Sequence, residues 1–135
     1  MRLLLATTAV LLLTFSAGAA MPVRTIASNQ KVAASGQPLV LARISSISPN
    51  CASVGSSSVQ LLGRPAHGQF AVQQIRAQGR YPAGNPRSKC NGRKLPMQQL
   101  TYVSTPGYQG PDVVQFQIVY PNGTADRVRI PLLVK

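Results

Sequence analysis

The chain has 135 residues, which is the length of one domain. It carries 14 Lys and Arg against two acidic residues, a formal net charge of +12 at pH 7, and one histidine. So few carboxylate and imidazole groups leave little material for acid–base catalysis and no ligand set for a zinc ion, so neither a metal nor a cofactor is expected.

Residues 1–20 have the layout of a secretory signal peptide. Arg2 is a short positive segment, the residues from Leu3 to Phe15 are apolar apart from threonines, and those from Ser16 to Ala20 are small enough for a signal peptidase. The apolar run is short for a membrane span, although a single anchor helix is the alternative. We therefore expect an exported protein, periplasmic or extracellular.

The next part of the chain shows short apolar segments between turn residues. Residues 21–37 lack periodicity and are interpreted as a flexible N-terminal arm. Residues 38–47 and 59–62 are predicted to be the first two strands. A third strand is predicted over residues 69–76, although their glutamines and alanines would also suit a helix.

The last third has the clearest pattern. After a loop rich in proline and glycine over residues 77–96, a strand is predicted over 97–103. Apolar and polar residues then alternate over 113–120 and 127–135, on either side of Asn122-Gly123. This pattern predicts a β-hairpin with one face on the core.

Six or so short strands without a convincing helix favour an all-β antiparallel sandwich over residues 38–135, with a closed barrel as the alternative. Pro131 cannot donate a ladder hydrogen bond, so the final strand is expected at an edge or locally irregular.

Cys51 and Cys90 are the only cysteines. Export to an oxidising compartment predicts a disulfide between them, which would add roughly 4 kcal/mol by the chain-entropy model. Two free or intermolecular thiols are the alternative. Neither cysteine lies in a C-x-x-C pair, so a redox enzyme is not supported.

Two motifs resemble those of bacterial Ig-like and cadherin-like domains. Pro65-Ala66-His67-Gly68 is similar to their P-x-H-G turn, and the stretch from Tyr102 to Phe116 resembles their Y-x-P-x-x-G-[FY]-x-G-x-D-x-F-x-[FY] signature. One extra residue falls before Pro106, and Val114 replaces the usual aromatic residue. The resemblance implies a single bacterial Ig-like antiparallel β-sandwich of about six to seven strands. It also implies a structural corner made by Pro65, His67, Gly68, Tyr102, Gly107, Tyr108, Gly110 and Asp112.

The residue types suit such a corner. Gly107 and Gly110 allow a positive φ, Tyr108 can cover the end of the core, and Asp112 can accept bonds from backbone amides of the corner. His67 is then a turn residue rather than a base. Two acids in a cationic domain are too few for a calcium site.

A basic segment over residues 76–94 is the candidate binding site. Its guanidinium and ammonium groups suit phosphates and carboxylates, with lipopolysaccharide, anionic lipid, acidic glycan or an envelope protein as the expected partner. A solvated loop that only keeps the domain soluble is the alternative. Nucleic acid is not favoured, because export removes it and aromatic residues are sparse. The cations of this segment are Arg76, Arg80, Arg87, Lys89, Arg93 and Lys94.

We therefore expect a non-enzymatic, monomeric Ig-like domain of the cell envelope with a binding or structural role. A cationic effector or inhibitor of a protein target is one alternative. A small hydrolase that uses His67 is another.

Overall fold

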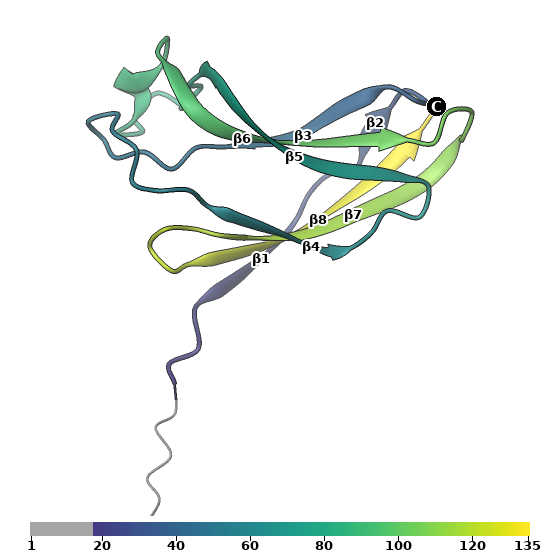
Figure 1. Ribbon diagram of the computed structural model, residues 1–135, viewed down its shortest axis with the longest axis horizontal. Coiled ribbons are helices and arrows are strands. Elements are labelled where there is room, and N and C mark those ends of the chain that lie inside the picture. Colours follow the sequence, from purple (N-terminus) through teal and green to yellow (C-terminus); the bar gives the residue numbers. More distant parts are fainter. Residues whose placement is uncertain (1–17) are drawn as a thin grey trace, which may run out of the picture.

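A computed structural model describes residues 18–135, which form two β-sheets packed face to face (Figure 1). The predicted signal peptide lies almost wholly outside these residues. Apart from a 3₁₀ turn at Ser88–Cys90, the described residues form strands and loops, and this part of the chain has no helix suited to crossing a membrane. The strands are β1 Val23–Ala27, β2 Lys31–Ala33, β3 Pro38–Ile44, β4 Ser58–Gly63, β5 Gly68–Gln78, β6 Lys94–Ser104, β7 Gly110–Val119 and β8 Ala125–Val134.

The two sheets have distinct strand orders. The first runs β1-β8-β7-β4, with β2 also paired to β8, and the second runs β3-β6-β5. If β3 is taken as strand B of the immunoglobulin scheme, the order β3-β6-β5 corresponds to strands B-E-D, and the order β4-β7-β8 corresponds to strands C-F-G. The predicted all-β sandwich is confirmed. Six of the strands, β3 to β8, lie within the predicted domain of residues 38–135, and β1 and β2 precede it. The two separate sheets show that the closed barrel is wrong.

The predicted C-terminal hairpin is also confirmed. Strands β7 and β8 pair antiparallel from Gly110↔Val134 to Val119↔Ala125, and Gly123 takes a φ of +83° in the turn between them. Alternate side chains of both strands enter the core, because successive residues of a strand point to opposite faces. These buried residues are Val114, Phe116, Ile118, Ile130, Leu132 and Val134.

The N-terminal arm differs from its prediction. Strands β1 and β2 both run parallel to β8, so the expectation of an arm without structure over residues 21–37 is wrong. The pairing with β8 stops at Ala27↔Arg129 and resumes at Lys31↔Leu132, so the ladder is interrupted beside Pro131. Because a proline has no N–H to give, the break falls where the ladder cannot be completed. Pro131 therefore lies in a central strand that is locally irregular, and the edge position is wrong.

The β5–β6 hairpin is longer than predicted, and the face of β6 that is buried differs between its two ends. The strand predicted at 69–76 is confirmed as β5, whereas the loop predicted at 77–96 shrinks to 79–93. Leu100 and Tyr102 of β6 enter the main core, but Leu95 and Met97 point to the opposite face and are buried too. A second, smaller core covers that face, where the ends of β5 and β6 curve away from the other sheet (Figure 1).

One buried carboxylate connects the two sheets at the end of the sandwich near the C-terminus. Asp112 of β7 accepts hydrogen bonds from the backbone N–H groups of Ala66, His67 and Val113 at 2.9, 3.0 and 2.8 Å. It also accepts one from the hydroxyl of Tyr102 on β6 at 2.8 Å. Asp112 was expected to bond amides of the corner, and the amides it meets are those of the β4–β5 turn and its own neighbour.

The glycines of this corner are required by close contacts at one position and by backbone conformation at two others. A Cβ at Gly68 would lie 2.5 Å from the carbonyl oxygen of Val103 and 2.6 Å from the ring of Tyr102. Gly107 and Gly110 have φ of +85° and +134°, in the region that favours glycine, as expected. The corner therefore depends on the absence of side chains as much as on Asp112.

We predict that Asp112→Asn lowers the free energy of unfolding by about 3 kcal/mol, because an amide nitrogen would face donors that now meet a carboxylate oxygen. Urea unfolding monitored by circular dichroism at neutral pH measures this change. Tyr102→Phe, which removes only one donor, should cost about 1 kcal/mol. Equal stability of Asp112→Asn and the wild type would contradict the role given to this carboxylate.

Candidate functional site

The basic segment is an ordered loop rather than a free one. Strand β5 carries its first residues, and the chain then runs through the 3₁₀ turn at Ser88–Cys90 to β6. The backbone N–H of Tyr81 donates to Asn91 Oδ1, and Asn91 Nδ2 donates to the carbonyl of Tyr81, both at 2.8 Å. These reciprocal bonds hold the base of the loop closed.

The predicted disulfide between Cys51 and Cys90 is confirmed, with 5.6 Å between the two Cα atoms. It ties the β5–β6 loop to the β3–β4 loop. Cys90 is fully buried in the second core, where it packs with Ile47, Leu95 and Met97. Cys51 takes a φ of +69°, which is strained for a residue other than glycine, so the crosslink is held at some conformational cost.

The structure separates the six predicted cations into two groups. Arg76 and Arg87 hold the loop in place: Arg76 Nη2 donates to the carbonyl of Lys94 at 3.0 Å, and Arg87 Nε donates to the carbonyl of Ile47 at 2.6 Å. The remaining four side chains, on the loop and at the start of β6, are exposed to solvent. These are Arg80, Lys89, Arg93 and Lys94.

A hollow lies beside this loop, where three connections meet at one end of the sandwich. The β3–β4 loop, the β5–β6 loop and the β7–β8 turn all lie at the end opposite the C-terminus (Figure 1). Two depressions of about 400 and 330 Å³ adjoin there and share Ser45, Tyr81 and Tyr120. Arg87 and Asn122 line the larger depression. The two depressions together are called the loop-end groove below.

Sequence reasoning missed part of this groove. Arg43 of β3 and Arg80 line its smaller depression, yet only Arg80 belonged to the predicted segment. Tyr120 lines both depressions, although its position next to the Asn122-Gly123 turn indicated only a hairpin. Lys89, Arg93 and Lys94 are not among the lining residues of either depression.

The carboxylate nearest to the loop-end groove is already paired with an arginine of the protein. Asp126 accepts bonds from Arg24 Nε and Nη2, both at 2.9 Å, and from the hydroxyl of Tyr120 at 2.9 Å. The bond from Arg24 holds the pKa of Asp126 below its usual value despite burial. Burial, together with the bond to Asp126, raises the pKa of Tyr120 to about 12, so this tyrosine is a neutral donor at physiological pH.

His67 lies at the other end of the sandwich, where its ring stacks on Tyr108 with 3.9 Å between centroids. The hydroxyl of Tyr108 donates to the carbonyl of Pro111. Both carboxylates are bound to other groups, so the described residues give His67 no acidic partner. Within residues 18–135, no three His, Cys, Asp or Glu side chains come together.

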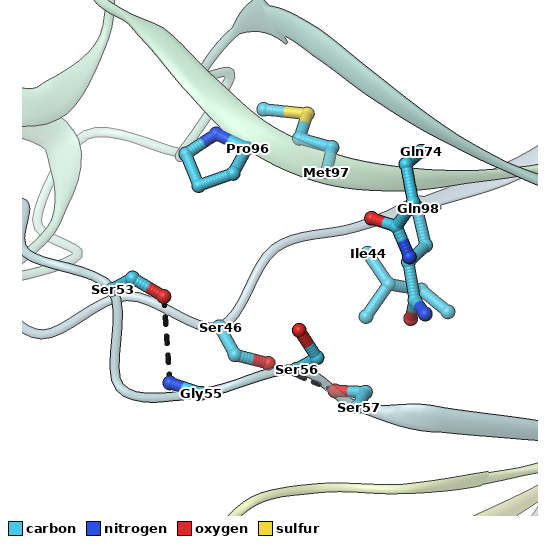
Figure 2. Close-up of a pocket in the computed structure, with 10 residues that line it drawn as sticks. All are labelled: Ile44, Ser46, Ser53, Gly55, Ser56, Ser57, Gln74, Pro96, Met97 and Gln98. Carbon is cyan, nitrogen blue, oxygen red and sulfur yellow. Dashed lines mark hydrogen bonds between the residues drawn. The ribbon is translucent and has the colours of Figure 1, made fainter.

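A serine-rich cavity lies under the β3–β4 loop and is too small for an organic substrate. Figure 2 shows Ser46, Ser53, Ser56 and Ser57 on the loop side, facing Gln98 and neighbouring residues of the second sheet. Its volume of about 40 Å³ suits a few water molecules. The hydroxyls of Ser46 and Ser57 bond each other at 2.8 Å, and no histidine or carboxylate lines this cavity, so it lacks the base of a serine nucleophile.

Comparison with known proteins adds little to this geometry. No protein-family model matches the sequence, and no curated protein matches it. A solved structure described as "Solution Structure of Amebosin" aligns over 84% of this chain and 99% of its own, with 11% sequence identity and a TM-score of 0.43. A similarity at that level carries no argument about function.

We predict that replacing both cysteines, as in Cys51→Ala with Cys90→Ala, lowers the free energy of unfolding by about 2–5 kcal/mol. The physical reason is that the second core is small and the crosslink limits the unfolded chain. Urea unfolding of the variant and of the reduced wild type measures the effect, and the two should agree. A variant as stable as the oxidised wild type would show that the loops hold together without the crosslink.

The two carboxylates and their tyrosine partners predict the dependence of stability on pH. Hydrogen bonds outweigh burial at Asp112 and lower its pKa, as Arg24 does at Asp126. Both groups therefore contribute stability that is complete above the ordinary aspartate pKa and is lost as pH falls through the lower folded values. Burial raises the pKa of Tyr102 and Tyr120, so their contribution is lost as pH rises above the ordinary tyrosine value of 10.0.

The melting temperature should accordingly be level between about pH 5 and 9 and fall on both sides. Differential scanning calorimetry across this range measures it. Asp112→Asn should reduce the fall of the melting temperature at acid pH. If the melting temperature of this variant falls as steeply as that of the wild type, groups other than Asp112 cause the acid unfolding.

Proposed function

We propose that the protein is an exported, non-enzymatic binding domain of the cell envelope that holds an anionic partner at the loop end of its sandwich. The observation that carries this proposal is the crosslinked basic loop. Arg80, Lys89 and Arg93 are exposed on a loop held by a disulfide, a second core and paired hydrogen bonds, and Lys94 is exposed where β6 begins. A loop that is ordered beforehand loses less conformational entropy when it binds.

The distribution of charge supports an anionic partner. Cations are spread over the surface, whereas both aspartates are buried against donors within the protein. No carboxylate is present among the described residues that line the loop-end groove, so the arginines there have no internal acid to compete with a ligand. Net charge of this sign also raises the rate of encounter with polyanions.

The proposed place in the cell rests on the disulfide and on the sequence. Structural disulfides persist in oxidising compartments, which supports export to a periplasm or to the outside. Lipopolysaccharide, anionic lipid and acidic glycan are the anionic components that such a domain would meet. The strand order and the corner at Asp112 support a single-copy relative of bacterial Ig-like and cadherin-like domains.

A non-enzymatic role is supported by the state of the reactive groups. His67 stacks on Tyr108, and the paired hydroxyls of Ser46 and Ser57 lie in a cavity without a base. Neither arrangement supplies a positioned nucleophile with a partner that could remove its proton.

We predict that the protein co-sediments with isolated envelope membranes and that binding falls steeply as salt is raised, because screening weakens exposed charge pairs. A loop variant with Arg80, Lys89, Arg93 and Lys94 changed to Gln should lose most of this binding. Arg87 stays in place, because its Nε holds the carbonyl of Ile47. The fraction of protein in the pellet across a salt series is the measurement.

A second variant of equal charge is the control. It changes to Gln four exposed cations that lie outside the basic segment and do not line the loop-end groove, and it should retain most binding. If both variants lose binding equally, net charge rather than the loop end governs the interaction. If neither loses binding, the proposed site is wrong. The control residues are Arg64, Arg127, Arg129 and Lys135.

A further inference from the structure

We propose that the loop-end groove binds a chain of carboxylated sugar units, a more specific form of the anionic partner proposed above and dependent on that proposal. The groove combines aromatic rings with arginines and small polar groups, whereas the exposed loop offers charge alone. This combination fits a ring-shaped ligand that is apolar on its faces and anionic at its edge.

Two tyrosines form the centre of the loop-end groove. Tyr81 and Tyr120 line both of its depressions, although they come from loops far apart in the sequence. Among the residues that the structure describes, the other aromatic rings are used elsewhere: Tyr102 and Phe116 are buried in the core, Phe70 stacks on Phe116, and Tyr108 stacks on His67. A tyrosine has an apolar body and a polar tip, which suits the C–H face and hydroxyl edge of a pyranose.

Both rings are held in position before any ligand arrives. Tyr81 packs against the second core, and its backbone is fixed by the two bonds to Asn91. Tyr120 packs against the main core, and its hydroxyl donates to Asp126. Neither ring would need to be ordered on binding, so the entropic cost for the protein is small.

Arginines lie on both sides of this tyrosine pair. Arg43 and Arg80 line the smaller depression and Arg87 lines the larger one. Arg43 Nε donates to Gln99 Oε1 at 2.9 Å, and Arg87 Nε to the carbonyl of Ile47, so both guanidinium groups are anchored through one nitrogen. A planar guanidinium suits a carboxylate, and cations at two positions fit a ligand with repeated acidic groups.

The size and lining of the groove also favour a saccharide over other anions. Each depression falls within the range of roughly 300–1,000 Å³ typical of small-molecule sites, and together they leave room for more than one ring. Ser45, Asn122 and Thr124 line it with groups that can bond sugar hydroxyls. Inorganic phosphate would make no use of the tyrosines, and a lipid chain would meet a lining rich in polar groups.

The test measures binding of tetragalacturonate by isothermal titration calorimetry at an ionic strength of about 0.15 M. Its methyl ester, inorganic polyphosphate and a short oligothymidylate are the comparison ligands. We expect the wild-type protein to bind the acid at least tenfold more tightly than the ester, because the ester removes the charge that the arginines recognise. The oligothymidylate should bind more weakly than tetragalacturonate.

Two variants separate stacking from charge. Tyr81→Leu and Tyr120→Leu keep an apolar side chain but remove the aromatic ring, and each should weaken tetragalacturonate binding about tenfold while polyphosphate binding changes less than twofold. Arg43→Gln together with Arg80→Gln should weaken both ligands. Tyr108→Leu is the matched control at the opposite end and should leave both unchanged, with thermal melting confirming that each variant is folded.

The outcomes distinguish this inference from the proposed function. If the tyrosine variants bind tetragalacturonate like the wild type, or the ester binds as well as the acid, the saccharide site is wrong. Polyphosphate binding that depends on the arginines would then leave the proposed anionic role intact. Tighter, tyrosine-dependent binding of oligothymidylate would overturn the saccharide in favour of a nucleic acid. If the wild type binds none of these anions, the saccharide site is wrong, and the salt-dependent co-sedimentation with envelope membranes decides the proposed anionic role separately.

Discussion

The buried carboxylate of Asp112 is the contact on which the arrangement of the two sheets depends. An ionised group in a protein interior is costly unless donors surround it, and Asp112 has four, three of them backbone amides. These donors come from the β4–β5 turn, from β6 and from β7, so the contact closes only when both sheets are in place. It therefore favours one alignment of the sandwich over others that would bury the same apolar side chains.

Asp126 has a comparable role at the opposite end of the sheet. It accepts bonds from Arg24 of β1 and from Tyr120, which precedes the β7–β8 turn. Both acids of the chain thus hold a tyrosine hydroxyl and a segment distant in sequence. Because both are used inside the fold, the charged side chains left on the surface are cations. The same two interactions that stabilise the domain therefore leave the arginines of the loop-end groove without competing acids.

The two ends of the sandwich are closed by different means, and this difference suits different roles. Polar contacts around Asp112 and steric limits at Gly68 close the end near the C-terminus, leaving little freedom for side-chain change. The opposite end is closed by the Cys51–Cys90 disulfide and the second core, which hold the loops at their bases. Their exposed residues can then carry charge and aromatic groups without being needed for folding. Binding residues are commonly placed on loops that a rigid scaffold positions in this way.

The sequence by itself determined the β class, the C-terminal hairpin around Asn122-Gly123 and the Cys51–Cys90 pair, because alternation, turn chemistry and a count of two cysteines are local or simple signals. Only the tertiary structure decided the rest. The pairing of β1 and β2 with β8 joins the two ends of the domain, and no periodicity in three to five residues reports it. The roles of Arg87 as an anchor and of Arg43 and Tyr120 as groove residues depend on three loops meeting in space. Local patterns report which face of a strand is buried, whereas a binding surface is made by contacts between segments that such patterns do not connect.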